Sequence, residues 1–384
     1  MKVAIVRGKF FNAYEMQSFE PLTRDFGLTG FASLTPSHDQ YKFPVVKLPS
    51  PMDLPDFPYK MSILNRLFID AHYLWGLEGK LKGFDLVHSA ETYYHYTQQS
   101  LNAKRKGYVK KVIATVLENI PFNNEGIWGR KAFKKRAREE LDHIVALTNL
   151  TRAALIKEGA DPGKITVIGH GIDINRFKPD KAHFKRLGSK RTQLTVMFSG
   201  RLEAYKGVYE IINAAKFLLT DPELKDYKLS FLLVGEGSEK RRLLAQEKKL
   251  GIASFIIHEK AAYAEMPRFY QKADIFVAPS VPTPTWQEQY CTVLLEAQAS
   301  GLPIVTTQSG GIPENVGEAA ILVAPADTLD LVRALKQFIL SPKLRLSYGY
   351  QSRQRAVTTH DAQIIAKKLA KLYRTLLSPM LQLR

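Results

Sequence analysis

The sequence predicts an α/β protein made of two doubly wound, Rossmann-like domains. Short β-branched runs alternate with helical patterns throughout the 384 residues, which is typical of parallel βαβ units with both faces of the sheet covered. The series of strands restarts after a polar stretch, and the chain is long for a single hydrophobic core. We therefore expect two domains facing a cleft, since open α/β sheets bind ligands beyond the carboxyl ends of their strands.

The expected strands fall into two series. The first lies at residues 2–6, 84–89, 111–116, 143–148 and 164–169. The second lies at residues 194–200, 228–237, 254–259, 274–280, 302–307 and 319–325. The intervening segment 169–193 is polar, contains Gly and Pro, and is interpreted as the interdomain linker. The expected domains are residues 1–175 and 176–359.

The C-terminal segment is expected to form an amphipathic helix. Its apolar residues recur at helical spacing, at Ile365, Leu369, Leu372, Tyr373 and Leu376. Pro379 marks its expected end. We expect the helical segment 360–384 to pack back on the N-terminal domain.

Composition limits where the protein can work. We find no apolar run of 18 or more residues, so a transmembrane helix is not expected. The N-terminal segment lacks the pattern of a signal peptide. Cys291 is the single cysteine, which rules out an internal disulfide and fits a reducing compartment. We therefore expect a cytoplasmic protein, with the inner face of the membrane as one possible place of action.

The net charge of +18 favours polyanionic partners such as nucleic acid, an anionic membrane or phosphorylated substrates. The alternative is a soluble protein with a basic surface. Residues 128–138 read WGRKAFKKRAR. On a helix, the basic residues Arg130, Lys131, Lys134, Lys135 and Arg138 fall on one side. One hypothesis is that Arg130–Arg138 contacts anionic lipid headgroups; the other is a solvated face. Nucleic acid is not expected, since no aromatic-rich basic motif is present.

Two glutamates mark the strongest local feature. In EQYCTVLLE, Glu288 and Glu296 are separated by seven residues. If a helix starts at Tyr290 or Cys291, Glu288 lies in the loop before it and Glu296 in its second turn. A helix N-terminus suits a diphosphate, and a carboxylate beside it can accept hydrogen bonds from vicinal hydroxyls. The alternative is an acidic first turn with a solvated glutamate.

Five motifs in order resemble those of retaining glycosyltransferases of family 4, which have the GT-B fold. They are SGRLEAYKG (199–207), VGEGSEKRRL (234–243), ADIFVAPS (273–280), the two spaced glutamates and ASGLPIVTTQSGGIPE (299–314). The resemblance is clearest over residues 165–330, whereas the N-terminal half matches in pattern only. It implies transfer of a hexose from a nucleotide diphosphate sugar to a saccharide or lipid-linked acceptor.

The resemblance also implies roles for individual residues. Arg201 and Lys206 match the basic pair that grips the donor diphosphate, where the leaving group gains negative charge. Glu288 matches the acidic residue near the hydroxyls of the transferred sugar. These three are the expected catalytic residues.

Five further residues are expected to bind the donor. Glu296 matches the glutamate that holds the donor ribose. Gly310 and Gly311 match a tight loop whose backbone approaches the donor, and Gly235 and Gly237 match a glycine-containing strand exit. Glycines permit such an approach, although they also occur in turns without ligands.

The N-terminal half departs from the family at informative positions. Gly8 stands alone where relatives carry a Gly-Gly pair, so Lys9, Asn12 or Glu15 could line the cleft instead. Ala90 replaces the second histidine of a His-x-His motif, and Glu91 or His95 could substitute for it. His170 matches a linker loop at the cleft. Asn12, Glu91, His95 and His170 are therefore the candidate acceptor residues.

No metal or cofactor is expected, because Arg201 and Lys206 would supply positive charge and no cluster of metal ligands is evident. Two other functions remain open. One is a GT-B-fold nucleotide-sugar epimerase, which the four charged motif residues match less well. The other is a non-catalytic basic binding protein, suggested by the net charge.

Overall fold

The protein forms two compact units in a computed structural model that describes residues 1–38, 40–252, 254–258 and 261–378. Unit 1 comprises Met1–Gly171 and the segment that begins at Ala362, and unit 2 comprises Ile172–Asp361. The expected division was at residues 175 and 360. Each unit has one parallel sheet with helices on both faces, which confirms the predicted α/β class with two doubly wound domains.

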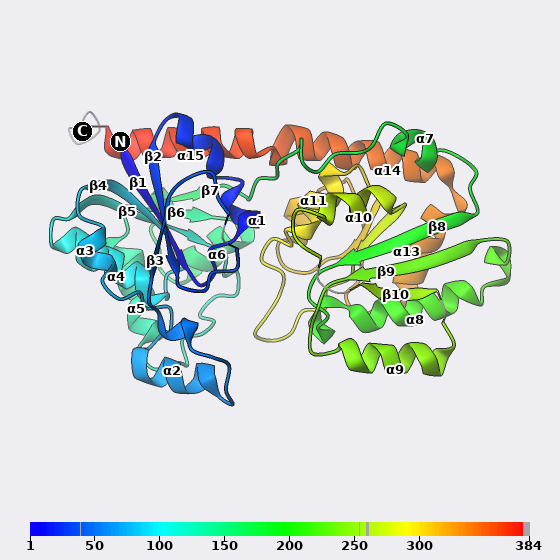
Figure 1. Ribbon diagram of the computed structural model, residues 1–384, viewed down its shortest axis with the longest axis horizontal. Helices are drawn as coiled ribbons and strands as arrows, with labels where there is room; N and C mark the ends of the chain where they lie inside the picture. The colour runs from blue at the N-terminus through cyan, green and yellow to red at the C-terminus, as the bar shows by residue number, and fades with distance from the viewer. Residues whose placement is uncertain (39, 253, 259–260, 379–384) are drawn as a thin grey trace. The chain divides into compact units, whose positions relative to one another are not determined.

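The sheet of unit 1 has seven strands in the order β3-β2-β1-β4-β5-β6-β7 (Figure 1). Alternate side chains of its first strand enter two different cores: Val3 and Ile5 one, Ala4 and Val6 the other. Burial on both faces explains why such strands read as continuous apolar runs. The strands are β1 (Lys2–Gly8), β2 (Gly27–Ser33), β3 (Val45–Leu48), β4 (Phe84–Ala90), β5 (Val109–Val116), β6 (His143–Ala146) and β7 (Ile165–Val167).

The sequence did not predict β2 and β3. β2 contains two glycines, which weaken a strand pattern. Gly30 is required there because an added Cβ would lie 2.5 Å from the ring of Phe11. β3 has only four residues and directly follows Pro44. Tertiary packing, which the local sequence does not reveal, completes this edge of the sheet.

Helices cover both faces of the unit 1 sheet. α4 and α3 pack on one face, α15 packs on the other, and α2 lies at the periphery of the unit (Figure 1). The helices are α1 (Ala13–Met16), α2 (Lys60–Phe68), α3 (Leu77–Lys80), α4 (His95–Arg105), α5 (Arg130–Glu140), α6 (Asn149–Lys157) and α15 (Ala362–Leu377), with 3-10 turns η1 (Glu20–Arg24), η2 (Pro51–Asp53) and η3 (Pro162–Lys164).

The C-terminal helix α15 belongs to the core of unit 1. Ile365, Leu369 and Tyr373 are buried against the sheet. The Tyr373 hydroxyl lies 2.6 Å from Nδ1 of His88, whose Nε2 lies 2.7 Å from the Thr115 hydroxyl. α15 ends at Leu377, and the expected stop at Pro379 lies outside the described residues. His88 is therefore used to fasten α15.

The sheet of unit 2 has six strands in the order β10-β9-β8-β11-β12-β13. All of them were predicted, although the predicted runs extend past several observed ends. β11 ends at Ala278, and residue 259 of the expected third strand lies outside the described residues. The strands are β8 (Gln193–Ser199), β9 (Lys228–Val234), β10 (Phe255–His258), β11 (Ile275–Ala278), β12 (Ile304–Thr307) and β13 (Ile321–Val323).

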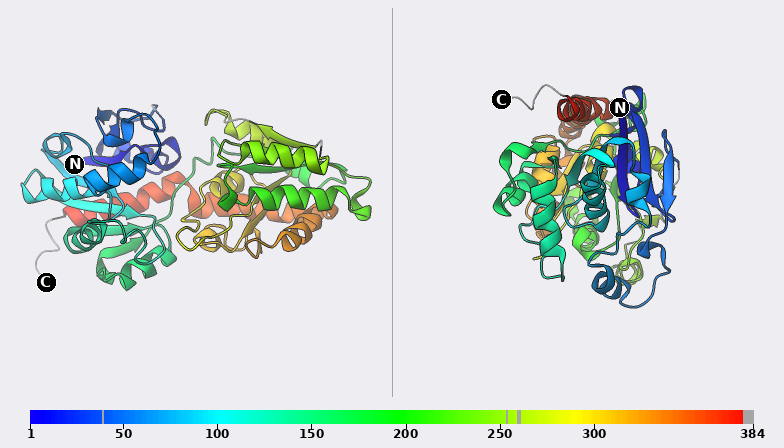
Figure 2. Two further views of the ribbon diagram at one scale, coloured as in Figure 1. Left: turned by 90° about the horizontal axis from the view of Figure 1, so that it is seen from below. Right: turned by 90° about the vertical axis from the view of Figure 1, so that its left-hand side faces the viewer.

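The helices of unit 2 also form two layers. α8 packs beside α9 and α13 on one face of the sheet, and α10 and α11 cover the other (Figures 1 and 2). The elements are α7 (His183–Leu187), α8 (Val208–Leu219), α9 (Lys240–Leu250), α10 (Met266–Lys272), α11 (Val293–Ala299), α12 (Ile312–Val316), α13 (Thr328–Leu340) and α14 (Pro342–Arg355), with short turns η4 (Ala204–Lys206), η5 (Pro222–Leu224) and η6 (Ala356–His360).

The predicted linker at residues 169–193 was wrong in extent. From Ile172 onward this segment belongs to unit 2, and Phe177, His183 and Leu187 are fully buried there. Nε2 of His183 lies 2.9 Å from the Gly301 carbonyl oxygen. The segment reads as a linker because these few buried residues are spaced among many polar ones without a regular period.

Candidate functional site

The loops that follow β8 and β9 meet backbone to backbone at the carboxyl edge of the unit 2 sheet. A Cβ added to Gly235 would lie 1.9 Å from the Gly200 carbonyl oxygen, and one added to Gly237 would lie 2.2 Å from that of Leu202. Both positions must therefore be glycine for the loops to pack. This contact holds the segment that carries Arg201, so the two glycines act on the site through its shape.

The loops around β11 and β12 make a second close contact. Gly310 has a φ of +54°, and an added Cβ would lie 1.9 Å from the Glu288 carbonyl oxygen. The Gly311 amide donates to that same oxygen at 2.8 Å. The pair Gly310–Gly311 thereby fixes the backbone of Glu288.

Lys206 and Glu288, for which the resemblance implied separate roles at the diphosphate and the sugar, form an ion pair. Lys206 Nζ lies 2.7 Å from Glu288 Oε1, and the Ser280 hydroxyl donates to the same oxygen at 2.7 Å. The Glu288 side chain is 5% exposed and the Lys206 side chain 19%. Gly207, at φ +76°, allows this approach because its Cβ would lie 1.9 Å from the Pro279 carbonyl oxygen. The loop after β8 is thus tied to the loop after β11.

Two aromatic rings accompany the cations. The rings of Tyr205 and Trp286 lie 4.3 Å apart. Lys206 Nζ lies 4.8 Å from the centroid of Trp286, and Arg201 Cζ lies 5.3 Å from that of Tyr205. Arg201 is exposed and forms no ion pair with any residue that the structure describes. Its charge is therefore available to an anion.

Glu296 lies in a separate buried pocket of hydrogen bonds. The Tyr270 hydroxyl donates to Glu296 Oε2 at 2.7 Å, and the carboxylate is 4% exposed. Burial raises the pKa of Glu296 to about 7, against the opposing effects of hydrogen bonds from Tyr270 and Tyr263 and the charge of Arg176. Tyr270 also hydrogen-bonds Ser199, the last residue of β8, which links Glu296 to the same edge of the sheet.

The helix that carries Glu296 starts later than expected. α11 begins at Val293, so Glu296 lies in its first turn and not in its second. Cys291 cannot start the helix because its φ is +55°, in the left-handed region. That conformation is easier for glycine than for a residue with a side chain. Burial raises the pKa of the Cys291 thiol well above its usual value.

The unit 2 site therefore combines free and paired cations with two buried carboxylates. Arg201 and Lys206 can hold a diphosphate, and Glu288 and Glu296 can accept hydrogen bonds from hydroxyls. Sequence reasoning missed Ser280, Trp286 and Tyr270. The signals for the first two were available, since Ser280 ends the ADIFVAPS motif and Trp286 stands two residues before Glu288.

In unit 1, the predicted acceptor residues Asn12 and His170 make contacts that support the fold. Asn12 caps α1, where its Oδ1 accepts from the Glu15 amide at 2.9 Å. Glu15 in turn pairs with the buried Arg7 at 2.7 Å. His170 is 7% exposed and lines a small cavity of about 10 Å³ beside Glu15. Burial lowers the pKa of His170.

Glu91 is held in a strained and buried position at the end of β4. Its φ is +56° and it is 3% exposed. Oε1 accepts from the amides of Leu117 at 2.8 Å and Glu118 at 3.1 Å, while Oε2 is buried and has no partner among the described residues. Burial, followed by the charge of Glu118, raises the pKa of Glu91 to about 8. Strain of this kind is concentrated at functional sites.

Replacing Glu91 by glutamine should flatten the pH dependence of stability. The folded protein keeps a proton on Glu91 up to pH about 8, whereas the unfolded chain releases it near the ordinary value of 4.5. The free energy of unfolding should therefore fall as pH rises through this window, by up to about 1.4 kcal/mol per pH unit from this group. Glutamine cannot ionise and removes that slope.

The measurement is the urea midpoint of both proteins at pH 5.5, 7 and 8.5. Glu139→Gln is the matched control, because Glu139 lies on α5 with its side chain 61% exposed. Curves for Glu91→Gln and the unmodified protein that stay parallel from pH 5.5 to 8.5 would contradict the raised pKa.

His95 belongs to a buried cluster around Asp70 that the sequence did not predict. Asp70 accepts hydrogen bonds from the His95 amide at 3.1 Å, from Nδ1 of His72 at 2.9 Å and from Arg130 at 2.8 Å. Burial would raise the pKa of Asp70, but the charges and hydrogen bonds of His72 and Arg130 hold it below its usual value. Nδ1 of His95 lies 2.8 Å from the Phe68 carbonyl oxygen. The sequence Asp70-Ala71-His72 was the signal from which this cluster could have been predicted.

The five basic residues expected on one side of α5 are not all exposed. Arg130 and Lys134 are buried, with Lys134 2.5 Å from Glu158, and Arg138 reaches the same glutamate at 3.1 Å. Lys131 and Lys135 stay exposed. Three of the five basic side chains therefore pair with buried carboxylates, and the other two remain exposed.

Among the residues that the structure describes, no helix is both long and apolar enough to cross a membrane. No group of three or more His, Cys, Asp or Glu side chains among them could hold a metal ion.

Comparison with known proteins links both halves of the chain to sugar transferases. Residues 179–355 match the family described as Glycosyl transferases group 1, and residues 30–176 match Glycosyltransferase Family 4. A D-inositol 3-phosphate glycosyltransferase of Actinosynnema mirum is 33% identical over 218 residues, or 54% of this chain and 51% of its own. A glycogen synthase of Mycobacterium tuberculosis is 32% identical over 226 residues, or 57% and 50%. The chain spans about half the length of these curated relatives.

Solved structures show the same fold at low identity. Sucrose-phosphate synthase from Thermosynechococcus elongatus superposes with a TM-score of 0.77 at 18% identity over 98% of this chain and 99% of its own. Anabaena HepE in complex with UDP gives 0.76 at 16% identity over 97% and 99%. The fold is therefore GT-B. Since the two family matches together cover most of it, the chain belongs to glycosyltransferase family 4.

Proposed function

We propose that this protein is a retaining glycosyltransferase that moves a hexose from a nucleotide diphosphate sugar to a saccharide or lipid-linked acceptor. The observation that carries the proposal is the Lys206–Glu288 pair beside the exposed Arg201 at the carboxyl edge of the unit 2 sheet. Open α/β sheets bind ligands at this edge. A donor of this class is supported by the solved relative HepE, which binds UDP and UDP-glucose.

The basic residues would stabilise the departing diphosphate. When the bond from the anomeric carbon to the diphosphate oxygen breaks, that oxygen keeps the electron pair and gains negative charge. Arg201 and Lys206 would neutralise this charge, which is an interaction that strengthens in the transition state. The same oxygen would take the proton of the acceptor hydroxyl as the acceptor oxygen bonds to the anomeric carbon, so the protein need not supply a base.

The carboxylates would hold the sugar hydroxyls of the donor. Lys206 and Ser280 both bind Oε1 of Glu288, which fixes the orientation of its carboxylate. In this proposal Glu288 accepts from the transferred hexose, and Glu296 accepts from the ribose. Gly311 and Gly310 hold the backbone next to Glu288, so transfer depends on them through position.

We further propose that transfer requires no metal ion and no cofactor, because the two cations supply the charge that a metal would provide. The test begins with a thermal-shift screen of nucleotide sugars, in which the donor should raise the melting temperature in proportion to its saturation. The best binder should then release its nucleotide diphosphate when acceptors are added, with the rate unchanged in EDTA.

Absence of stabilisation by any nucleotide sugar would reject the donor assignment, and a rate abolished by EDTA would reject metal independence. Formation of an isomeric sugar without any acceptor would identify an epimerase instead.

A further inference from the structure

Residues 54–67 of unit 1 present a dense set of exposed apolar side chains. Six of them have exposed fractions between 39% and 81%: Leu54, Phe57, Tyr59, Met61, Ile63 and Leu67. We call these six residues the α2 apolar surface. Soluble proteins seldom leave so many large apolar side chains exposed in one short segment, and such surfaces mark interaction sites.

Polar bonds hold this segment in place. Lys60 Nζ donates to the Met52 carbonyl oxygen at 3.3 Å and to that of Leu54, and it pairs with Asp56 at 3.2 Å. Within α2, Leu64 is the buried residue. The exposure of the apolar side chains is therefore a property of a defined turn and helix.

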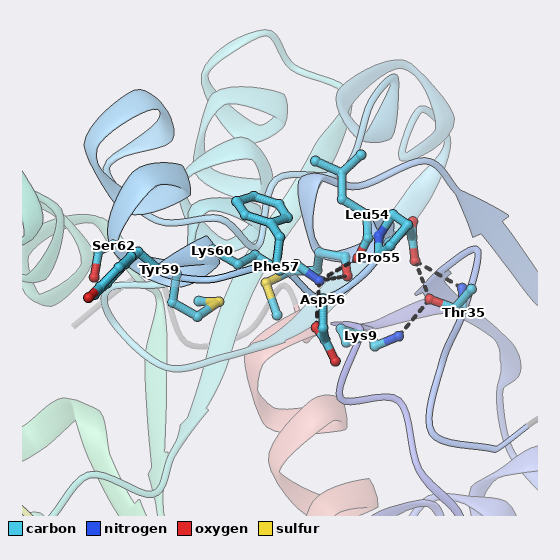
Figure 3. Close-up of a pocket in the computed structure, with 12 residues that line it drawn as sticks. Lys9, Thr35, Leu54, Pro55, Asp56, Phe57, Tyr59, Lys60 and Ser62 are labelled. Atoms are coloured by element: carbon cyan, nitrogen blue, oxygen red, sulfur yellow. Dashed lines mark hydrogen bonds and ion pairs between the residues drawn. The ribbon is translucent and has the colours of Figure 1, made fainter.

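A cavity of about 660 Å³ adjoins the α2 apolar surface (Figure 3). Four of the six residues of the α2 apolar surface also line this cavity. Lys9, Thr35 and Asp53 line its polar side. Lys9 directly follows β1, Thr35 comes shortly after β2, and Asp53 lies in the turn η2 after β3. These strands are neighbours in the sheet, so the cavity lies beyond the carboxyl ends of three adjacent parallel strands, where α/β sheets bind ligands.

On the polar side of the cavity, hydrogen bonds fix Thr35 and Asp53, whereas Lys9 and Asp56 can still bind a ligand. The Thr35 hydroxyl donates to Asp53 Oδ1 at 2.7 Å, and Lys9 Nζ donates to Thr35 Oγ1 at 2.6 Å (Figure 3). Asp53 also accepts from the Leu34 and Thr35 amides, so its carboxylate is occupied. Lys9 forms no ion pair within the described part of the chain, and the Asp56 side chain is fully exposed. Both can contact sugar hydroxyls.

We infer that this cavity binds the acceptor and that the acceptor is an amphiphile, a sugar carried on a hydrocarbon chain. The inference rests on the proposed function for the acceptor role. The sugar contacts Lys9 and Asp56, and the chain lies on the α2 apolar surface. The volume of 660 Å³ is that of an ordinary small-ligand site. A soluble saccharide would leave the apolar side chains uncovered, and a purely apolar partner would not use the polar side.

The first test measures binding without any donor. Isothermal titration compares n-dodecyl β-D-maltoside, below its micelle-forming concentration, with maltose and with a dodecyl sulfobetaine. The maltoside should bind at least tenfold more tightly than either. Tyr59→Ser and Lys9→Met should each weaken it about tenfold, whereas Leu329→Ser should have no effect, because Leu329 is 55% exposed on α13 of unit 2. Equal binding of maltoside and sulfobetaine, or of maltoside and maltose, would overturn the inference.

The second test measures transfer from the donor found in the screen. The kcat/KM should be at least tenfold higher for dodecyl glycosides than for the matching methyl glycosides, and Tyr59→Ser should remove this difference. Leu329→Ser should leave both this difference and the hydrolysis of the donor unchanged, because Leu329 lies on α13 and belongs to neither proposed site. Equal kcat/KM for the two series would overturn the inference.

The outcomes separate this inference from the proposed function. Donor hydrolysis together with a preference for methyl glycosides keeps the transferase and rejects the amphiphilic acceptor. No reaction of any nucleotide sugar rejects the transferase and with it the acceptor role, even if the maltoside binds.

Discussion

Replacing Lys206 by methionine should lower the rate of sugar transfer by about 10²–10³-fold, because one cation is lost where the departing diphosphate gains charge. In this variant Glu288 still accepts a hydrogen bond from the Ser280 hydroxyl, so its carboxylate keeps a partner. The measurement is nucleotide diphosphate release at saturating acceptor, with circular dichroism to verify the fold. Arg201→Met should act in the same direction, since Arg201 is the second cation on this loop.

Lys336→Met is the matched control for Lys206. Lys336 also pairs with a carboxylate in unit 2, at 2.6 Å from Asp221, but it lies on α13. Its loss should leave the transfer rate within about twofold, because this pair contains none of the residues proposed to bind the donor. A Lys206→Met protein that transfers sugar at the unmodified rate would remove Lys206 from the mechanism and weaken the proposed function as a whole.

Replacing Glu296 by glutamine should abolish a pH dependence of donor binding. The pKa of Glu296 is raised to about 7, so the carboxylate is neutral below and ionised above this value. Ribose hydroxyls donate more strongly to an ionised carboxylate. The donor affinity should therefore rise about tenfold from pH 6 to pH 8. A single protonation with a pKa of about 7 can change the affinity by at most tenfold per pH unit. The Glu296→Gln protein should bind the donor weakly at both pH values.

The probe is the nucleotide sugar itself, whose two phosphates are both esterified and do not titrate in this range. The groups that face Glu296 are Tyr270, Tyr263 and Arg176. Glu223→Gln is the control, since Glu223 is 70% exposed and pairs with Lys336. If Glu296→Gln keeps the slope of the unmodified protein, the titrating group lies elsewhere.

The sequence predicted the strands that have strong apolar runs. It also predicted two successive domains, each with its own parallel sheet. It failed where local pattern and tertiary context diverge. β2 gives a weak strand pattern because Gly30 makes room for Phe11, which belongs to a separate segment of the chain. The start of the helix before Glu296 was misplaced because the left-handed backbone of Cys291 cannot be seen in the sequence.

The candidate site was predictable to the extent that it depends on motifs. The pairing of Lys206 with Glu288 follows from residues in two separate motifs, which the structure brings to one edge. The basic run on α5 was misread because its partners Asp70 and Glu158 lie far away in sequence. The cavity proposed to bind the acceptor was the hardest part to predict, since it is built from three loops that share no motif.

The route of the chain also determines the order in which the protein can be completed. The chain leaves unit 1 after Gly171 and returns at Ala362, where the two residues are packed so closely that a Cβ on Gly171 would lie 2.8 Å from the Ala362 Cα. During synthesis, the ribosome must therefore produce all of residues 172–361 before the helix fastened by Tyr373 can cover its face of the first sheet.

At the usual rate of translation that delay is on the order of 10–40 s. The uninterrupted second unit can fold from its own residues in the meantime. Until then the core that contains Val3, Ile5 and Leu86 lacks the apolar side chains of α15, and incompletely covered apolar surface makes a folding intermediate prone to aggregation.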